Sequence, residues 1–160
     1  DYAILFCIAA FLRGAYSFFL WQDETLFFVE DSQIYWVSVQ DWLTSGGFNH
    51  LLRAGDGEAY FSITERTPGY TIFLLVSHFI FGESVISVVL IQGIIDSVTC
   101  LIVATLGGMF SRSVGLISGV LASAWPNLVI HSAIILTDTL FVFFVLFIHI
   151  HIYIHVVWYV

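Results

Sequence analysis

Carboxylates are the groups in this sequence whose clustering suggests chemistry, and nine of the twelve acidic residues lie within residues 22–83. These nine are Asp23, Glu24, Glu30, Asp31, Asp41, Asp56, Glu58, Glu65 and Glu83. A positioned carboxylate can act as a general base on an attacking hydroxyl, typically worth about 10²–10⁴-fold in rate. Two candidates compete for such a role, the Asp23-Glu24 pair and Asp31. Asp31 has a structural alternative, because aspartate is also a favoured N-cap of a helix.

Arg66 and Asp138 are the other residues whose types suggest chemistry. An arginine stays charged and directs its planar fork of donors at phosphate oxygens, so Arg66 is a candidate phosphate ligand. Its alternative is a snorkelling arginine that pairs with Glu65 or with lipid headgroups. Asp138 stands directly before a long apolar run. An acidic residue at a membrane boundary is a functional hypothesis by default, and its alternative is again an N-cap.

The composition indicates that lipid surrounds the elements that position these residues. Hydrophobic residues make up 59% of the 160 residues and charged residues only 10%, whereas soluble domains have roughly 45–50% and about 25%. The four basic residues are all arginines, and the formal charge is −8. Nucleic-acid binding is therefore excluded, since it requires clustered basic residues.

Four apolar stretches reach the roughly 20 residues that a helix needs to cross a bilayer. They are residues 2–21, 84–109, 114–136 and 140–160. The polar-to-mixed stretch 22–83 forms the first outer loop, and we expect two helices in it that lie along the membrane surface, at 31–44 and 68–81. The sequence therefore predicts an all-α membrane protein, a polytopic bundle of about four transmembrane helices plus two juxtamembrane surface helices.

The orientation of this bundle follows from parity and from one arginine. The connection between the second and third spans, residues 107–113, contains Arg112 and no acid, so the positive-inside tendency places it in the cytoplasm. The acid-rich loop and Asp138 then lie together on the extracytoplasmic face. This shared face would bring Asp31, Arg66 and Asp138 to one site.

Other polar residues lie inside the predicted spans. Asp96 follows Gln92 by one helical turn, and we expect an interhelical hydrogen bond there in preference to a proton relay. Arg13 should snorkel or face the bundle interior, with no partner evident from the sequence. We interpret the histidines His149, His151 and His155 as structural. We interpret Cys7 and Cys100 as small buried hydrophobic residues.

A series of short motifs, in order along nearly the whole chain, resembles the type-C membrane glycosyltransferases, which include protein O-mannosyltransferases and lipid A aminoarabinose transferases. The motifs are Asp31-Ser-Gln-Ile-Tyr35, Ser45-Gly46, Glu65-Arg66-Thr-Pro68-Gly69-Tyr70, Phe81-Gly82, the Arg112 connection, Trp125-Pro126, and Leu136-Thr137-Asp138-Thr139-Leu140-Phe141. The resemblance implies that the chain is the N-terminal part, residues 1–160, of a single membrane glycosyltransferase domain.

The resemblance also chooses between the candidate bases. In that family the base precedes a tyrosine by four residues and a Ser-Gly by about fourteen, which implies Asp31 with Tyr35 as a supporting residue. The family often has a second acid directly after the base, whereas this chain has Ser32. A role that needs paired carboxylates is therefore not expected at this position.

The same resemblance implies roles for three further residues. Arg66 would bind the donor phosphate, and Asp138 would position the donor or support the base. Glu65 would support the site and is a candidate ligand for a divalent metal, although no set of ligands accompanies it in the sequence. No other cofactor is implied.

These expectations combine into one function. The enzyme would move a sugar from a polyprenyl- or dolichyl-phosphate carrier to an acceptor hydroxyl on a protein, lipid or glycan. It would work at the outer or lumenal face of a bacterial inner membrane, a plasma membrane or the endoplasmic reticulum. We expect these 160 residues to be inactive by themselves, because the acceptor pocket of such enzymes draws on later spans. The alternative is a polytopic transporter or a non-catalytic membrane subunit, in which Arg13, Gln92 and Asp96 would mark a translocation path.

Overall fold

A computed structural model describes residues 1–45 and 68–159 of the chain. This described part is all-helical, as the sequence predicts. Its elements in chain order are α1 (Tyr2–Leu20), the 3₁₀ helix η1 (Glu24–Phe27), α2 (Glu30–Ser45), α3 (Pro68–Phe81), α4 (Val85–Gly108), α5 (Arg112–Ala124), α6 (Pro126–Ser132) and α7 (Asp138–Tyr159). The two predicted surface helices correspond to α2 and α3.

Three of the described helices, α1, α4 and α7, are long and apolar enough to cross a membrane. They match the first, second and fourth predicted spans to within two residues. The predicted third span, 114–136, differs from the structure because it is divided into α5 and α6, which meet at an angle of 54°. The break follows from Pro126, which cannot donate a backbone hydrogen bond and forces extended backbone on Trp125. If this bent pair is one span, the described part has four.

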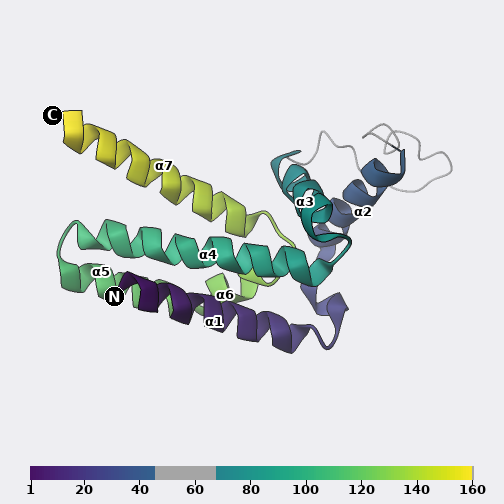
Figure 1. Cartoon of the computed structure of the whole chain (residues 1–160), viewed down its shortest axis with the longest axis horizontal. Helices are drawn as coiled ribbons and strands as arrows, with labels where there is room; N and C mark the ends of the chain where they lie inside the picture. The colour runs from purple at the N-terminus through teal and green to yellow at the C-terminus, as the bar shows by residue number, and fades with distance from the viewer. Residues whose placement is uncertain (46–67, 160) are drawn as a thin grey trace.

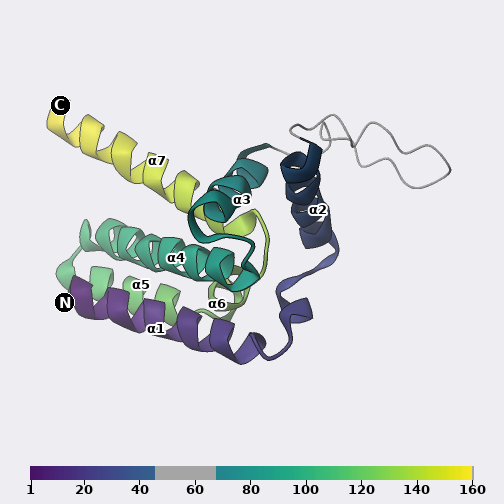
Figure 2. The same cartoon turned by 45° about the vertical axis from the view of Figure 1, so that its right-hand side comes forward.

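The long helices run side by side, with α4 between α1 and α7, and α5 against α1 and α4 (Figure 1). Helices α2 and α3 lie at one end of this bundle, where α1 ends and α4 and α7 begin (Figures 1 and 2). The α4–α5 connection and both chain ends lie at the opposite end. The two ends of the predicted outer loop thus lie with Asp138, and the Arg112 connection lies away from them.

Glycines allow α4 and α5 to pack closely. A Cβ atom on Gly115 would come within 2.7 Å of the Ala104 carbonyl oxygen and 2.8 Å of the backbone of Gly108. A Cβ atom on Gly119 would meet the Cβ atom of Ala104 at 2.7 Å. Small residues at helix contacts are the usual means by which helices in lipid bring their backbones together.

A buried ion pair joins three helices. The Nε–H group of Arg13 on α1 donates to Oδ2 of Asp96 on α4 at 2.6 Å, and both residues are 1% exposed. The other guanidinium donors reach the Ala9 carbonyl at 3.1 Å and the Ser123 carbonyl of α5 at 3.2 Å. Sγ of Cys100 lies 3.2 Å from one guanidinium nitrogen. The interhelical bond predicted for Asp96 is confirmed, and Arg13 is its partner.

Apolar side chains cover the outside of the bundle, whereas several polar side chains lie within it. Large exposed hydrophobic residues include Ile4, Phe11, Phe18, Ile94, Ile117, Leu121, Phe141, Phe144, Phe147 and Ile148. In a water-soluble protein such contiguous apolar surface would favour association. Polar groups paired inside an apolar shell are typical of helices packed in lipid.

The predictions for the two cysteines and for the histidines of α7 can be compared with the structure. Cys100 is buried as predicted, but Cys7 is exposed on the outer face of α1, so the prediction was wrong for that residue. The ring centroids of His151 and His155 lie 4.5 Å apart on α7, and Nδ1 of His149 is 2.9 Å from the Val145 carbonyl. Figure 1 shows that α7 runs away from α2 and α3 toward its C-terminus, so these histidines lie far from Asp138.

We expect Arg13→Leu to lower the free energy of unfolding by about 3–5 kcal/mol, because it leaves the buried Asp96 carboxylate without its counter-charge. The double variant Arg13→Leu/Asp96→Leu should recover most of this loss, since it removes both charges. Unfolding of detergent-solubilised protein measures the effect. The control is Arg112→Leu, whose ion pair with Asp1 is exposed and contributes under about 1 kcal/mol. Equal losses for Arg13→Leu and Arg112→Leu would contradict the prediction.

Candidate functional site

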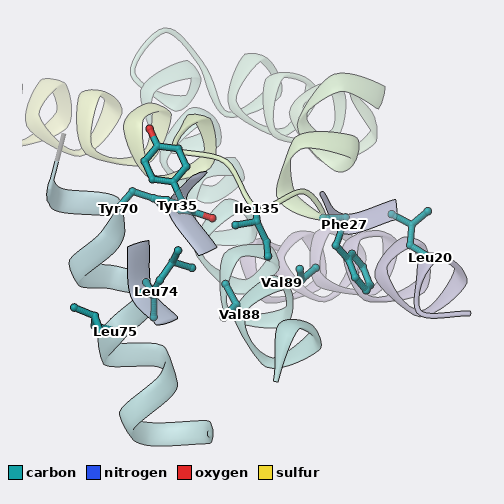
Figure 3. Close-up of a cluster of buried hydrophobic side chains, with 11 residues drawn as sticks. Leu20, Phe27, Tyr35, Tyr70, Leu74, Leu75, Val88, Val89 and Ile135 are labelled. Carbon is teal, nitrogen blue, oxygen red and sulfur yellow. The ribbon is translucent and has the colours of Figure 1, made fainter. Parts of the chain in front are cut away.

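Two tyrosines attach α2 and α3 to the end of the bundle. The rings of Tyr35 on α2 and Tyr70 on α3 meet edge to face, with centroids 5.0 Å apart and an interplanar angle of 76°. Both are buried within one apolar cluster, in which Figure 3 shows them beside Ile135 from the segment before α7. The other members of this cluster are Leu20, Phe27, Val39, Leu74, Leu75, Val88, Val89 and Ala133.

Gln92 links this tyrosine pair to the segment between α6 and α7. Its Oε1 atom accepts the Tyr70 hydroxyl at 2.5 Å, and its Nε2 atom donates to the Ile134 carbonyl at 2.8 Å. A longer contact of 3.4 Å reaches the Ser132 carbonyl. These carbonyls lie where α6 ends, so a glutamine of α4 supplies donors that a continuing helix would otherwise have provided.

Asp138 forms the first turn of α7 and is paired across the α6–α7 turn. Its Oδ2 atom lies 3.1 Å from Nδ1 of His131, and both side chains are about half exposed. The Thr139 hydroxyl donates to the His131 carbonyl at 3.2 Å. The backbone of Ile135 donates to the Phe27 carbonyl at 3.0 Å, which ties this turn to η1. The Asp138 carboxylate is therefore held by His131, and the turn before it is held by the bonds of Thr139 and Ile135.

Asp31 lies in the first turn of α2, one residue after the helix begins at Glu30. The residue before the helix is Val29, and Oγ of Ser32 accepts the Val29 backbone N–H at 3.0 Å. Ser32 thus makes the reciprocal bond that a capping box uses at its third helical position. Ser32 therefore has a structural role at the start of α2. The alternative in which Asp31 is the N-cap does not hold.

Asp23, the rival base, has a capping role of its own. Its Oδ1 atom accepts the Thr25 hydroxyl at 2.6 Å and the Thr25 backbone N–H at 3.1 Å. These bonds lower the pKa of the Asp23 carboxyl below its ordinary value. A lower pKa makes Asp23 a weaker general base.

A cleft of about 350 Å³ opens beside Asp138, between α4, α6 and α7. Its lining residues are Asp96, Trp125, Asn127, Leu128, His131, Asp138, Thr139 and Val142. Asp31 and Tyr35 are not among them. The cleft therefore adjoins the predicted site on the Asp138 side only.

The structure brings together part of the predicted set. Tyr35 contacts Tyr70, and the Asp138 carboxylate is near enough to Tyr70 to affect its pKa. Asp31 joins this group through its position one turn before Tyr35, on the same face of α2. Glu65 and Arg66 lie outside the described residues. Within residues 1–45 and 68–159, no three potential metal ligands of the His, Cys, Asp and Glu types lie close enough together to hold an ion.

Three residues of this region were not recognised as site components from the sequence. In the sequence, Tyr70 lies within one of the motifs, Gln92 lies one helical turn from Asp96, and His131 belongs to no motif. Pro126 is the feature of the sequence that could have indicated His131, because a helix break at Pro126 allows His131 to lie near the start of α7. Comparison with known protein families, with curated proteins and with solved structures finds no match for this chain.

Tyr70→Phe tests the link to Gln92. Burial raises the pKa of Tyr70 well above its ordinary value of 10.0, and the neighbouring Tyr35 and Asp138 raise it further. Because the folded form holds the proton more tightly than the unfolded form, this contribution is full below pH 10 and is lost as the pH rises toward the folded pKa. We expect Tyr70→Phe to cost about 1–3 kcal/mol at pH 8, since Gln92 loses a donor, and to reduce the loss of stability above pH 10.

The measurement is the unfolding midpoint between pH 8 and pH 11. Tyr153→Phe is the control, because Tyr153 is exposed on α7. An unchanged pH dependence in Tyr70→Phe would show that Tyr70 is not the group that titrates.

Proposed function

We propose that the chain forms the donor half of a membrane glycosyltransferase, which moves a sugar from a polyprenyl- or dolichyl-phosphate carrier to an acceptor hydroxyl. Its helices α1, α4, α7 and the bent α5–α6 pair would lie in the bilayer, with α2 and α3 on the extracytoplasmic surface. A lipid-linked donor would then meet the bundle where its phosphate reaches the headgroup level.

One observation supports this proposal above the others. The first turn of α2, which carries Asp31, and the first turn of α7, which carries Asp138, stand at the same end of the bundle as the Tyr35–Tyr70 pair. Two residues that are 107 positions apart in the sequence thus lie at the same end of the bundle, and a cleft of ligand size opens beside the second of them, Asp138. In this proposal Asp31 acts as the base and Asp138 holds the donor.

The reaction would need one proton transfer and one displacement. The acceptor oxygen attacks the anomeric carbon, the bond from that carbon to the phosphate oxygen breaks, and the bonding electrons leave with the carrier phosphate. Asp31 takes the proton of the acceptor hydroxyl. Arg66, which stands two residues before α3, would stabilise the charge on the departing phosphate.

We expect Asp31→Asn to lower transfer by at least about 100-fold in the full-length enzyme, because an amide cannot accept the proton. Transfer from purified lipid-phosphate sugars measures the effect, and folding is checked by the unfolding midpoint. Asp23→Asn is the matched control, since Asp23 lies in the same loop and caps η1. Full activity of Asp31→Asn, or an equal loss in Asp23→Asn, would contradict the assignment of the base.

Transport is the second candidate function, and one observation favours it. Asp96 stands near the middle of α4, lines the cleft and pairs with Arg13, as a coupling site in a translocation path would. Asp96→Asn should then abolish solute uptake into proteoliposomes. Under the glycosyltransferase proposal, the same variant weakens the fold but leaves the sugar transfer of the remaining folded protein intact.

A further inference from the structure

The cleft between α4, α6 and α7 has an uneven lining. Trp125, Leu128 and Val142 give it apolar walls, whereas Asn127, His131 and Asp138 provide hydrogen-bonding groups. Ligand sites are commonly clefts of this size, mainly apolar with a few placed polar groups that orient the ligand. Asn127 and Trp125 are exposed, and His131 and Asp138 are half exposed, so these groups are open to an occupant.

The charges of the cleft select among occupants. Its charged lining residues are the carboxylates of Asp96 and Asp138, and Arg13 neutralises the first of them. A phosphate group would be repelled by the remaining Asp138 carboxylate. A bare hydrocarbon chain would cover the polar groups of Asn127, His131 and Asp138 without replacing their bonds to water, which is costly.

An uncharged sugar ring satisfies both conditions. Its hydroxyls can donate to a carboxylate and exchange hydrogen bonds with an amide and an imidazole, as Asp138, Asn127 and His131 require. Its C–H face can pack on the indole ring of Trp125. The pairing of Nδ1 of His131 with Asp138 leaves the other ring nitrogen available to a hydroxyl.

We propose that this cleft is the subsite for the sugar ring of the lipid-linked donor, with Trp125 as the stacking surface and Asn127, His131 and Asp138 as the hydroxyl ligands. The proposal rests on the proposed function, because that function supplies the lipid-linked sugar. It adds that sugar and phosphate are bound separately. The cleft contributes affinity only when a sugar is attached to the carrier.

The experiment compares two ligands on the full-length protein in lipid nanodiscs. One is a short-chain polyprenyl phosphate that carries glucose, galactose or mannose, and the other is the same phosphate without sugar. We expect the wild type to bind at least one loaded carrier about tenfold more tightly than the free phosphate. Trp125→Ala should lose about that factor for the loaded carrier and leave the affinity for the free phosphate unchanged. Asn127→Ala, on an exposed side chain, should weaken the loaded carrier selectively in the same way.

Trp21→Ala is the matched control. Trp21 is 49% exposed at the end of α1, compared with 57% for Trp125, and does not line the cleft. Equal wild-type affinity for loaded and free carrier would overturn the subsite, as would a loss in Trp125→Ala that is the same for both ligands or is matched by Trp21→Ala. Selective binding without transfer to any acceptor would retain the subsite and remove the proposed function. Transfer with a normal KM in both cleft variants would retain the proposed function and remove the subsite.

Discussion

A buried charge must have a partner, and this requirement determines how α1, α4 and α5 meet. Arg13 supplies the counter-charge for Asp96 and at the same time donates to backbone carbonyls of α1 and α5. Gln92 stands one turn away on α4 and connects the same polar seam to α3 and to the α6–α7 turn. The helix α4 therefore organises the described structure through two polar side chains, while the apolar faces of its neighbours remain outside.

The candidate site depends on these buried polar contacts of α4, because they hold in place the helices that carry the residues of the site. Tyr70 is fixed by Gln92, and Tyr35 packs on Tyr70, so α2 is positioned indirectly through this tyrosine contact. Asp138 is fixed from the other side by His131 and by the bond between Ile135 and η1. A site assembled in this way has its carboxylates on helix starts, where backbone N–H groups favour negative charge.

Much of the fold could be predicted from the sequence because run length and apolar content decide which segments can cross a bilayer. The limits of α1, α4 and α7 follow from local composition, as do the two short helices α2 and α3 that lie between α1 and α4. The partners could not be predicted in this way. Arg13 and Asp96 are 83 residues apart, and the pairing of His131 with Asp138 depends on a break at Pro126 that a tilted or kinked helix could have absorbed. Cys7 shows the converse error, since an apolar run alone does not reveal which face of a helix is buried.

The bonds from Gln92 have a consequence for motion. The α6–α7 turn is irregular in its backbone path, yet its carbonyls at Ser132 and Ile134 are held by a side chain rooted in the middle of the bundle. Tyr70 is held by that same amide group, so a shift of α3 relative to the α6–α7 turn would break or stretch at least one of these hydrogen bonds. The Gln92 amide thus couples α3 to the α6–α7 turn, and we expect α3 and the beginning of α7 to move together.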